Sequence, residues 1–291
     1  MTIEVEAPRI TAPAKVNLFL HVGDKRPDGY HALQSLVAFT RLGDELTFSR
    51  DPELHLVLRG PFAGALEAEA DNLVLKAARA LQAHAGVTHG AAITLTKNLP
   101  VASGLGGGSA DAAAALRGLS RLWELKLCDG ALRKIGETLG SDVPVCVTCT
   151  PQWMEGRGEK LTEVKAVPAM PIVLVNPGVG VPTAKVFAAL KERRGTGLPL
   201  PPKMETPAEL LAYLKDNSND LEAPARAIAP VIGEVLTTLE SQDGVCLTRM
   251  SGSGATCFAL FDSDEAAVKA ARAIGERRRE WWTAATQIES T

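Results

Sequence analysis

A glycine-rich segment at residues 100–114 (PVASGLGGGSADAAA) carries the pattern best suited to chemistry. Four of the five residues 104–108 are glycine, and Ser109 and a run of alanines follow. Glycine lacks a Cβ and can adopt positive φ, so several backbone N–H groups can turn toward one point. A helix that begins directly behind such a segment adds the positive end of its dipole and further N–H donors. The segment therefore indicates a phosphate-binding loop, with a flexible linker as the alternative.

The spacing of these glycines excludes two common phosphate loops. No Gly-Lys-Ser or Gly-Lys-Thr ends the segment as in a Walker A motif, and the glycines are contiguous rather than spaced as G-x-G-x-x-G. Apolar residues recur at helical spacing behind the loop, at Ala113, Leu116, Leu119 and Trp123. This spacing predicts a helix that anchors the loop to a core.

Lys15 and Asn17 form a second candidate pair near the N-terminus. Apolar residues alternate through this stretch, at Val16, Leu18, Leu20 and Val22. The alternation predicts a strand with one buried face, so Lys15 and Asn17 project side by side from the other face. A lysine there would suit a phosphate site, and an ordinary half-exposed strand is the alternative.

Tyr30 and His31 follow a turn sequence, Pro27-Asp28-Gly29. Proline fixes φ, aspartate bonds to its own backbone and glycine allows positive φ, which is the chemistry of a tight turn. The turn would present an aromatic ring and an imidazole at a loop tip, although a generic turn explains residues 27–29 equally well.

Two further segments lie at boundaries between predicted elements. Asp142 follows a helix predicted at residues 129–139 and precedes Pro144, so it can project into a cleft; a simple turn aspartate is the alternative. Residues 251–256 (SGSGAT) join strands predicted at 245–250 and 257–261, and a tight turn would also explain their glycines.

Charge excludes some classes of partner. The chain has 31 Lys and Arg against 34 Asp and Glu, a formal net charge of -3, and no block of five like charges. Binding to nucleic acid or to a membrane surface is therefore not predicted. No run of 18 apolar residues and no signal-peptide pattern is present, so we expect a cytoplasmic protein.

The five cysteines predict no disulfide framework, because their number is odd and they are scattered through a long chain. Cys146 and Cys149 form a C-x-x-C within residues 143–149, which we predict to be a strand. Positions i and i+3 of a strand point to opposite faces, so the two thiols would not share a metal ion or a disulfide.

The elements alternate between strands and helices along the chain. A composition shift follows residues 156–159, and a buried strand begins near residue 171. Helices are predicted at residues 184–190, 207–214, 221–228, 231–239 and 263–279, with an ordinary tail after the last. Residues 193–207 are rich in Pro and Gly and predict a mobile surface loop.

Three of these segments together resemble the three motifs of the GHMP small-molecule kinase superfamily. They are residues 12–18 (APAKVNL), residues 100–114 and residues 251–256, and the resemblance runs in order from about residue 10 to residue 261. Residues 26–31, 106–109, 139–144 and 176–178 resemble the members whose substrate carries a cytidyl diphosphate.

The resemblance implies a two-domain α+β fold. An N-terminal ribosomal-protein-S5-like, ATP-binding domain would span residues 1–165 and a C-terminal α+β domain residues 166–291, with ATP and substrate meeting in the cleft between them. It implies ATP-dependent phosphorylation of an alcohol on a small cytidyl diphosphate substrate, with ATP as co-substrate and Mg²⁺ as its cation. No acidic cluster identifies protein ligands for Mg²⁺, which suits an ion held by phosphates and water.

The resemblance also assigns roles residue by residue. Lys15 and Asp142 become the catalytic pair, and Asn17 a polar helper on the substrate. The other substrate-binding positions are Tyr30 and His31 at the cytosine, and Thr183 and Phe187 in the second domain. The ATP-binding positions are Asn72, Lys97, Pro100, Gly104, Leu105, Gly106, Gly107, Gly108 and Ser109.

Two other functions stay open at this point. One is a kinase of the same superfamily that acts on another small alcohol, and Tyr30 and His31 argue against it because only a substrate with a base needs such a platform. The other is a non-catalytic ATP- or metabolite-binding regulator on this fold. The presence of Lys15, Asp142 and the complete glycine loop argues against that function.

Overall fold

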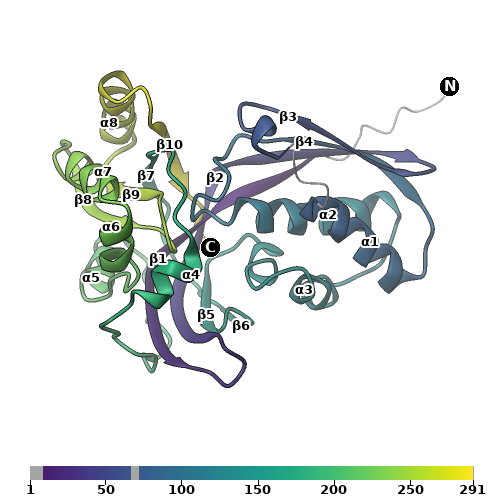
Figure 1. Cartoon of the computed structure of the whole chain (residues 1–291), viewed down its shortest axis with the longest axis horizontal. Helices are drawn as coiled ribbons and strands as arrows, with labels where there is room; N and C mark the ends of the chain where they lie inside the picture. The colour runs from purple at the N-terminus through teal and green to yellow at the C-terminus, as the bar shows by residue number, and fades with distance from the viewer. Residues whose placement is uncertain (1–8, 67–71, 291) are drawn as a thin grey trace. The chain divides into compact units, whose positions relative to one another are not determined.

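The computed structural model describes residues 9–66 and 72–290, and the chain forms two compact units (Figure 1). Unit 1 comprises Met1–Ala14, Gly43–Val101 and Gly107–Thr148. Unit 2 comprises Lys15–Leu42, Ala102–Gly106 and Cys149–Thr291. The units interleave along the sequence because the long strands β1 (Arg9–Lys25) and β2 (His31–Asp51) each contribute to both. The domain boundary after residue 165 stays a prediction.

The described residues of unit 1 form a short sheet and three helices. Its sheet pairs β3 (Leu54–Arg59) in parallel with β4 (Gly90–Thr96), and β4 antiparallel with the second half of β2. The helices are α1 (Leu73–Ala85), α2 (Gly107–Leu122) and α3 (Asp129–Glu137), and short 3-10 turns occur at η1 (Ala63–Ala65) and η2 (Pro144–Cys146). Figure 1 shows α1 and α2 side by side.

Local sequence explains where the helices of unit 1 begin and how α2 packs. The Asn72 side chain accepts a hydrogen bond from Val74 N at 2.9 Å and caps α1, which ends at Gly86 in the left-handed conformation. Any side chain at Gly118 would collide with the Phe48 ring, so this glycine lets α2 lie directly on β2. The predicted helix behind the glycine loop is thereby confirmed.

Unit 2 is built on an antiparallel sheet in the order β2-β10-β7-β9-β8. The strands are β7 (Met170–Asn176), β8 (Val245–Met250), β9 (Cys257–Phe261) and β10 (Trp282–Ile288). The hairpin of β5 (Gln152–Gly156) and β6 (Lys160–Glu163) pairs with β2. The helices are α4 (Thr183–Ala188), α5 (Pro207–Lys215), α6 (Glu222–Ile228), α7 (Val231–Glu240) and α8 (Asp264–Arg277). The apolar faces of α4, α6, α7 and α8 share one core with β7 and β9.

The prediction of a strand at residues 143–149 is wrong. The segment forms turns and the 3-10 helix η2, because Pro144 at its first position has the φ of a helical turn and no N–H to give to a sheet. The argument that separated Cys146 from Cys149 by strand geometry therefore fails. All five cysteines are nevertheless thiols in the structure, rather than disulfides.

The predicted C-terminal tail is also wrong, because the chain returns after α8 as β10. This strand pairs with β7 over seven positions, from Trp282 opposite Asn176 to Ile288 opposite Met170. Six of its seven residues are only half-buried, so its sequence shows no run of alternating apolar residues. Its place in the sheet depends on β7 rather than on its own pattern.

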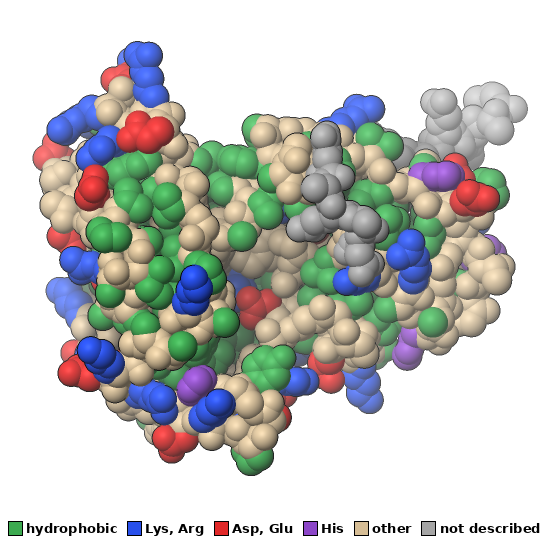
Figure 2. All heavy atoms as spheres, in the orientation of Figure 1, with side chains coloured by type: hydrophobic (Ala, Val, Ile, Leu, Met, Phe, Trp, Pro, Cys, Tyr) green, Lys and Arg blue, Asp and Glu red, His purple; other side chains and the backbone are tan. Residues whose placement is uncertain are grey.

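The distribution of surface charge and the character of the helices can be compared with the partner classes that the sequence excludes, nucleic acid and membrane. Lys and Arg side chains are interspersed with Asp and Glu on the face shown in Figure 2. Among the helices that the structure describes, none has the length and apolar character needed to span a membrane.

Candidate active site

Lys15 and Asn17 are buried on β1, so the alternative of an ordinary half-exposed strand does not hold. Both side chains are buried, as are Phe19 and His21 on the same face of β1 and the apolar residues on the other face. Lys15 N donates a hydrogen bond to Leu105 O at 2.9 Å, which ties the strand to the glycine loop. A Cβ on Gly106 would lie 3.1 Å from Lys15 Cε, so this glycine leaves room for the lysine stem.

The first glycine loop meets the second one within unit 2. Ser251 Oγ donates to Gly104 O at 3.1 Å, and Thr256 N donates to Ser103 O at 3.0 Å. Gly104 has a φ of +82°, and a Cβ there would lie 2.6 Å from Ser251 O. Only glycine combines this conformation with this close approach. The second glycine segment is therefore more than a tight turn, because it supports the first.

Asn17 joins the same assembly. Its backbone N donates to Ser251 Oγ at 3.2 Å, and its side-chain Nδ2 donates to Ser35 Oγ at 2.9 Å. The segments that resembled the three kinase motifs thus converge in unit 2, although 234 positions separate Asn17 from Ser251. Sequence reasoning missed the serine, which is buried at the centre of these contacts.

The remaining part of the glycine loop opens helix α2 in unit 1. Gly107 is the first residue of the helix, and Gly108 and Ser109 follow in its first turn. A Cβ at Gly108 would meet no atom of the described chain within 4 Å, so open space lies beside this turn. Pro100 and Leu105 are buried, and the carbonyl of Leu105 accepts the hydrogen bond from Lys15 N.

Asp142 lies in the turn between α3 and η2 and is half-buried. It belongs to unit 1, whereas Lys15 belongs to unit 2. The catalytic pairing of these two residues stays a prediction.

Tyr30 and His31 occupy the loop tip that the turn sequence predicts. Gly29 has a φ of +86°, and Tyr30 N donates to Asp28 Oδ1 at 3.2 Å. The Tyr30 ring is 53% exposed, and the guanidinium of Arg157 lies over it, 5.6 Å from its centroid. Arg157 is a contact that sequence reasoning missed, and it comes from the turn between β5 and β6.

His31 stacks on Phe187, with ring centroids 5.3 Å apart and an interplanar angle of 19°. Burial lowers the pKa of His31, and the nearby charges of Arg193 and Lys25 lower it further. The imidazole is therefore neutral near pH 7, so it offers one hydrogen-bond donor and one acceptor. Thr183, at the start of α4, hydrogen-bonds through its hydroxyl to Ser253 of the second glycine loop at 2.8 Å.

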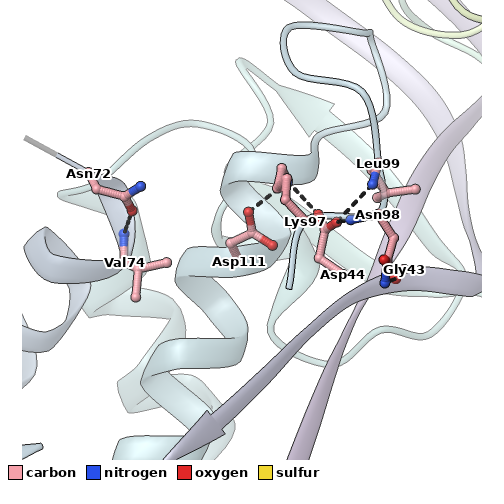
Figure 3. A network of polar contacts seen from close by, with 8 residues as sticks. All are labelled: Gly43, Asp44, Asn72, Val74, Lys97, Asn98, Leu99 and Asp111. Atoms are coloured by element: carbon pink, nitrogen blue, oxygen red, sulfur yellow. Dashed lines mark hydrogen bonds and ion pairs between the residues drawn. The ribbon is translucent and has the colours of Figure 1, made fainter. Parts of the chain in front are cut away.

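Asn72 and Lys97 are engaged in contacts within the protein (Figure 3). Asn72 caps α1 through its side-chain oxygen, while its amide nitrogen points away from that bond (Figure 3). Lys97 is 2% exposed, and its ammonium binds the carboxylates of Asp44 and Asp111. Burial alone would lower the pKa of Lys97, but the two carboxylates outweigh it and raise the pKa. Sequence reasoning missed both aspartates.

Comparison with known proteins now defines the class. Residues 72–150 match the GHMP kinases N terminal domain and residues 202–279 match the GHMP kinases C terminal domain. A homoserine kinase from Cytophaga hutchinsonii shares the fold, with a TM-score of 0.69 at 18% identity over 100% of this chain and 96% of that one. The chain is a GHMP kinase, and the predicted α+β fold is confirmed.

More similar relatives narrow the class. The 4-diphosphocytidyl-2-C-methyl-D-erythritol kinases of Parvibaculum lavamentivorans and Cereibacter sphaeroides are 47% and 49% identical, and their alignments cover 93% and 95% of this chain and 94% and 98% of those proteins. A crystal structure of 4-(cytidine 5'-diphospho)-2C-methyl-D-erythritol kinase superimposes with a TM-score of 0.77 at 32% identity, over 98% of this chain and 100% of that one. The chain belongs to the 4-diphosphocytidyl-2-C-methyl-D-erythritol kinase family.

Proposed function

We propose that this chain transfers the γ-phosphoryl group of ATP to the 2-hydroxyl of 4-diphosphocytidyl-2-C-methyl-D-erythritol. The products are the 2-phosphate and ADP, and the reaction belongs to the non-mevalonate route to isoprenoid precursors. The observation that supports this most strongly is the convergence, within unit 2, of Lys15 and Asn17 with residues 102–106 of the first glycine loop and with the second glycine loop, in a chain of this family. A cytoplasmic setting is part of the same proposal, because five cysteines, an odd number scattered through a long chain, predict no disulfide framework.

Lys15 and Asp142 carry the chemistry in this proposal. Phosphoryl transfer has a loose transition state, so positioning and charge stabilisation contribute more than a strong base. The Lys15 ammonium counters charge on the transferring phosphoryl group, and burial on β1 strengthens that interaction. Asp142 orients the substrate hydroxyl and accepts its proton late in the transfer.

The glycine loop holds the triphosphate. Gly104 and Gly106 have positive φ, and Gly107 to Ser109 form the first turn of α2 with its N–H groups. These groups favour anions without any side chain. The space beside Gly108 admits a phosphate against bare backbone.

Mg²⁺ accompanies ATP in this proposal and supplies further charge neutralisation. In the part of the chain that the structure describes, no group of three His, Cys, Asp or Glu residues gathers as a ready-made site. Phosphate oxygens and water therefore provide most of the ligands, which agrees with the small, strongly hydrated character of the ion.

The cytidyl end of the substrate is recognised by Tyr30, His31 and Phe187. The exposed Tyr30 ring provides a stacking face for cytosine, and Arg157 lies over the same ring. The neutral His31 matches the mixed donor and acceptor edge of the base. Phe187 fixes the His31 plane by stacking, and Thr183 marks the start of the same helix.

A substrate panel tests the proposal. ADP release would be followed with ATP and one alcohol at a time: the cytidyl diphosphate alcohol, mevalonate, homoserine or galactose. We expect turnover with the cytidyl substrate and at most background rates with the other three. Preferred turnover of one of those three would contradict the assignment.

A further inference from the structure

A cluster of three ionisable side chains lies buried in unit 1, next to the glycine loop (Figure 3). Lys97 follows β4, Asp44 lies on β2 and Asp111 lies on α2. Their side chains are 2%, 0% and 3% exposed. The Lys97 ammonium binds Asp44 Oδ2 and, at 2.8 Å, Asp111 Oδ2. Burying ionised groups costs free energy, and well-packed apolar side chains of similar volume are often at least as stabilising, so stability alone does not account for this cluster.

Asp44 also fixes the backbone that leads from β4 into the glycine loop. Its Oδ1 accepts hydrogen bonds from Asn98 N at 2.6 Å and from Leu99 N at 2.8 Å. The Asn98 side chain in turn donates to Gly43 O at 3.1 Å. One carboxylate therefore holds both the lysine and the chain directly before Pro100.

The other end of the loop rests on the same cluster. A Cβ at Gly107 would lie 3.0 Å from Lys97 Nζ and 3.7 Å from Asp44 Oδ2, so the first residue of α2 packs directly on the ammonium. Asp111 stands four residues further along α2 and therefore faces the same side as Gly107. The cluster thus contacts the strand before the loop and the first turn of the helix after it.

We propose that Asp44, Lys97 and Asp111 are positioning residues for ATP, which hold the first turn of α2 so that its N–H groups meet the triphosphate. The proposal rests on the proposed function, because that function makes the loop a triphosphate site. These residues act through Gly107 and the backbone of residues 98 and 99. Asp44 and Asp111 are thereby assigned a role in nucleotide binding.

Asp111 gives the cluster a pH-dependent charge. The pKa of Asp111 is raised to about 8, and burial is the main cause. The attraction of Lys97 lowers this pKa, and the repulsion of Asp44 raises it. Within the described chain, Asp111 Oδ1 has no hydrogen-bond partner, and Lys97 from β4 and Asp44 from β2 are the charged groups that face it. Ionisation above pH 8 places an additional negative charge behind the helix start, which opposes binding of the triphosphate.

Three carboxylate-to-amide variants test the proposal: Asp44→Asn, Asp111→Asn and, as a matched control, Asp129→Asn on the exposed first turn of α3. The ATP Kd by calorimetry, the KM for the cytidyl substrate and the Tm would be measured for each. Asp44→Asn should weaken ATP binding roughly tenfold or more, because small displacements of a binding group are costly. The KM for the cytidyl substrate should stay within about twofold of wild type, since the cluster orders the nucleotide loop alone.

The pH dependence of ATP binding in Asp111→Asn is a readout that would not change if the cluster only stabilised the fold. At pH 7 it should bind ATP within about threefold of wild type, because an amide resembles the protonated acid. Between pH 7 and pH 9 the wild type should lose ATP affinity and Asp111→Asn should not. This variant keeps the side-chain shape, so it remains informative if Asp44→Asn does not fold.

Two outcomes would overturn the positioning role. One is an ATP Kd in folded Asp44→Asn equal to that of Asp129→Asn; the other is a KM for the cytidyl substrate that rises as much as the ATP Kd in either carboxylate variant. If the wild type still binds ATP and phosphorylates the cytidyl substrate, either result would contradict the positioning role without contradicting the proposed function. A wild type that neither binds ATP nor phosphorylates the cytidyl substrate would instead contradict the proposed function itself.

Discussion

At the scale of single residues, the proposed site divides into groups that stabilise charge and groups that recognise the base. Lys15 is buried and fixed by its strand, whereas Tyr30 is exposed and held by a turn. This difference matches their roles, because a charge-stabilising group benefits from exclusion of water and a stacking face has to be reachable. Mutations in the two groups should therefore change different kinetic constants.

Asp142→Ala should reduce kcat by at least about 100-fold while the Kd for ATP stays near that of wild type, since it removes a positioned proton acceptor. Steady-state kinetics together with calorimetric ATP binding would check this. Turnover close to the wild-type rate would remove Asp142 from the mechanism.

Tyr30→Ala should chiefly raise the KM for the cytidyl substrate, because base stacking is worth roughly 1–3 kcal/mol. Tyr30→Phe is the matched control, since it keeps the ring that stacks and the face that Arg157 covers. The KM for ATP should be unaffected in both variants. An unchanged KM for the cytidyl substrate in Tyr30→Ala would refute the stacking role.

His31 should make recognition of the cytidyl substrate resistant to mild acid. Its pKa is lowered from 6.5, first by burial and then by Arg193 and Lys25, so the neutral form persists as the pH falls past 6.5. The KM for this substrate should stay constant through pH 6.5 and rise only at lower pH, where the imidazole takes up a proton. His31→Gln should lack that acid rise. A rise in wild type that begins above pH 6.5 would contradict a neutral His31.

At the scale of elements, the glycine loop depends on what lies behind each of its residues. Gly104 and Gly106 require positive φ, and Gly104 also packs against the second glycine loop. Gly107 rests on Lys97, whereas Gly108 faces open space. Neighbouring glycines of one motif therefore serve different purposes, and the same substitution should have different effects on them.

Gly107→Ala and Gly108→Ala form a matched pair. The methyl group at position 107 would press on the buried Lys97 ammonium, so the Tm should fall by roughly 2 to 4 °C for a loss of about 1–2 kcal/mol at this chain length. The methyl group at position 108 meets no atom of the described chain, so the Tm should change by only about 1 °C, while ATP binding weakens because the phosphate loses its space. Full ATP affinity in Gly108→Ala would move the phosphate site away from this turn.

At the scale of the whole molecule, local patterns predicted the elements that their own sequence determines. The alanine-rich helix α2 and the hairpin of β8 and β9 both follow from periodicity and turn residues. Strand β10 could not be predicted, because its residues form a strand only where β7 offers an edge. The turn at η2 was mistaken for a strand because its apolar residues are buried without any sheet.

Prediction of the candidate active site from sequence has the same limit, because only local patterns can be recognised. Lys15, Asn17 and the glycine loops were found because each lies in a contiguous motif. Asp44 was missed because 53 positions separate it from Lys97, and a single aspartate on a strand carries no local signal. Arg157 was missed as a contact because its position over Tyr30 depends on the pairing of β5 with β2. Strand pairing between distant segments brings these residues together, and such pairing cannot be recognised from local patterns in a single sequence.

The central claim is that ATP phosphorylates the alcohol end of an intact cytidyl diphosphate substrate. Phosphorus NMR of a completed reaction tests it most directly, with the purified chain, MgATP and 4-diphosphocytidyl-2-C-methyl-D-erythritol. We expect ADP, an unchanged diphosphate bridge and one new phosphomonoester signal without three-bond coupling to a proton, because the 2-carbon carries a methyl group and no hydrogen. Consumption of ATP without a new phosphomonoester, or cleavage of the diphosphate bridge, would contradict the account.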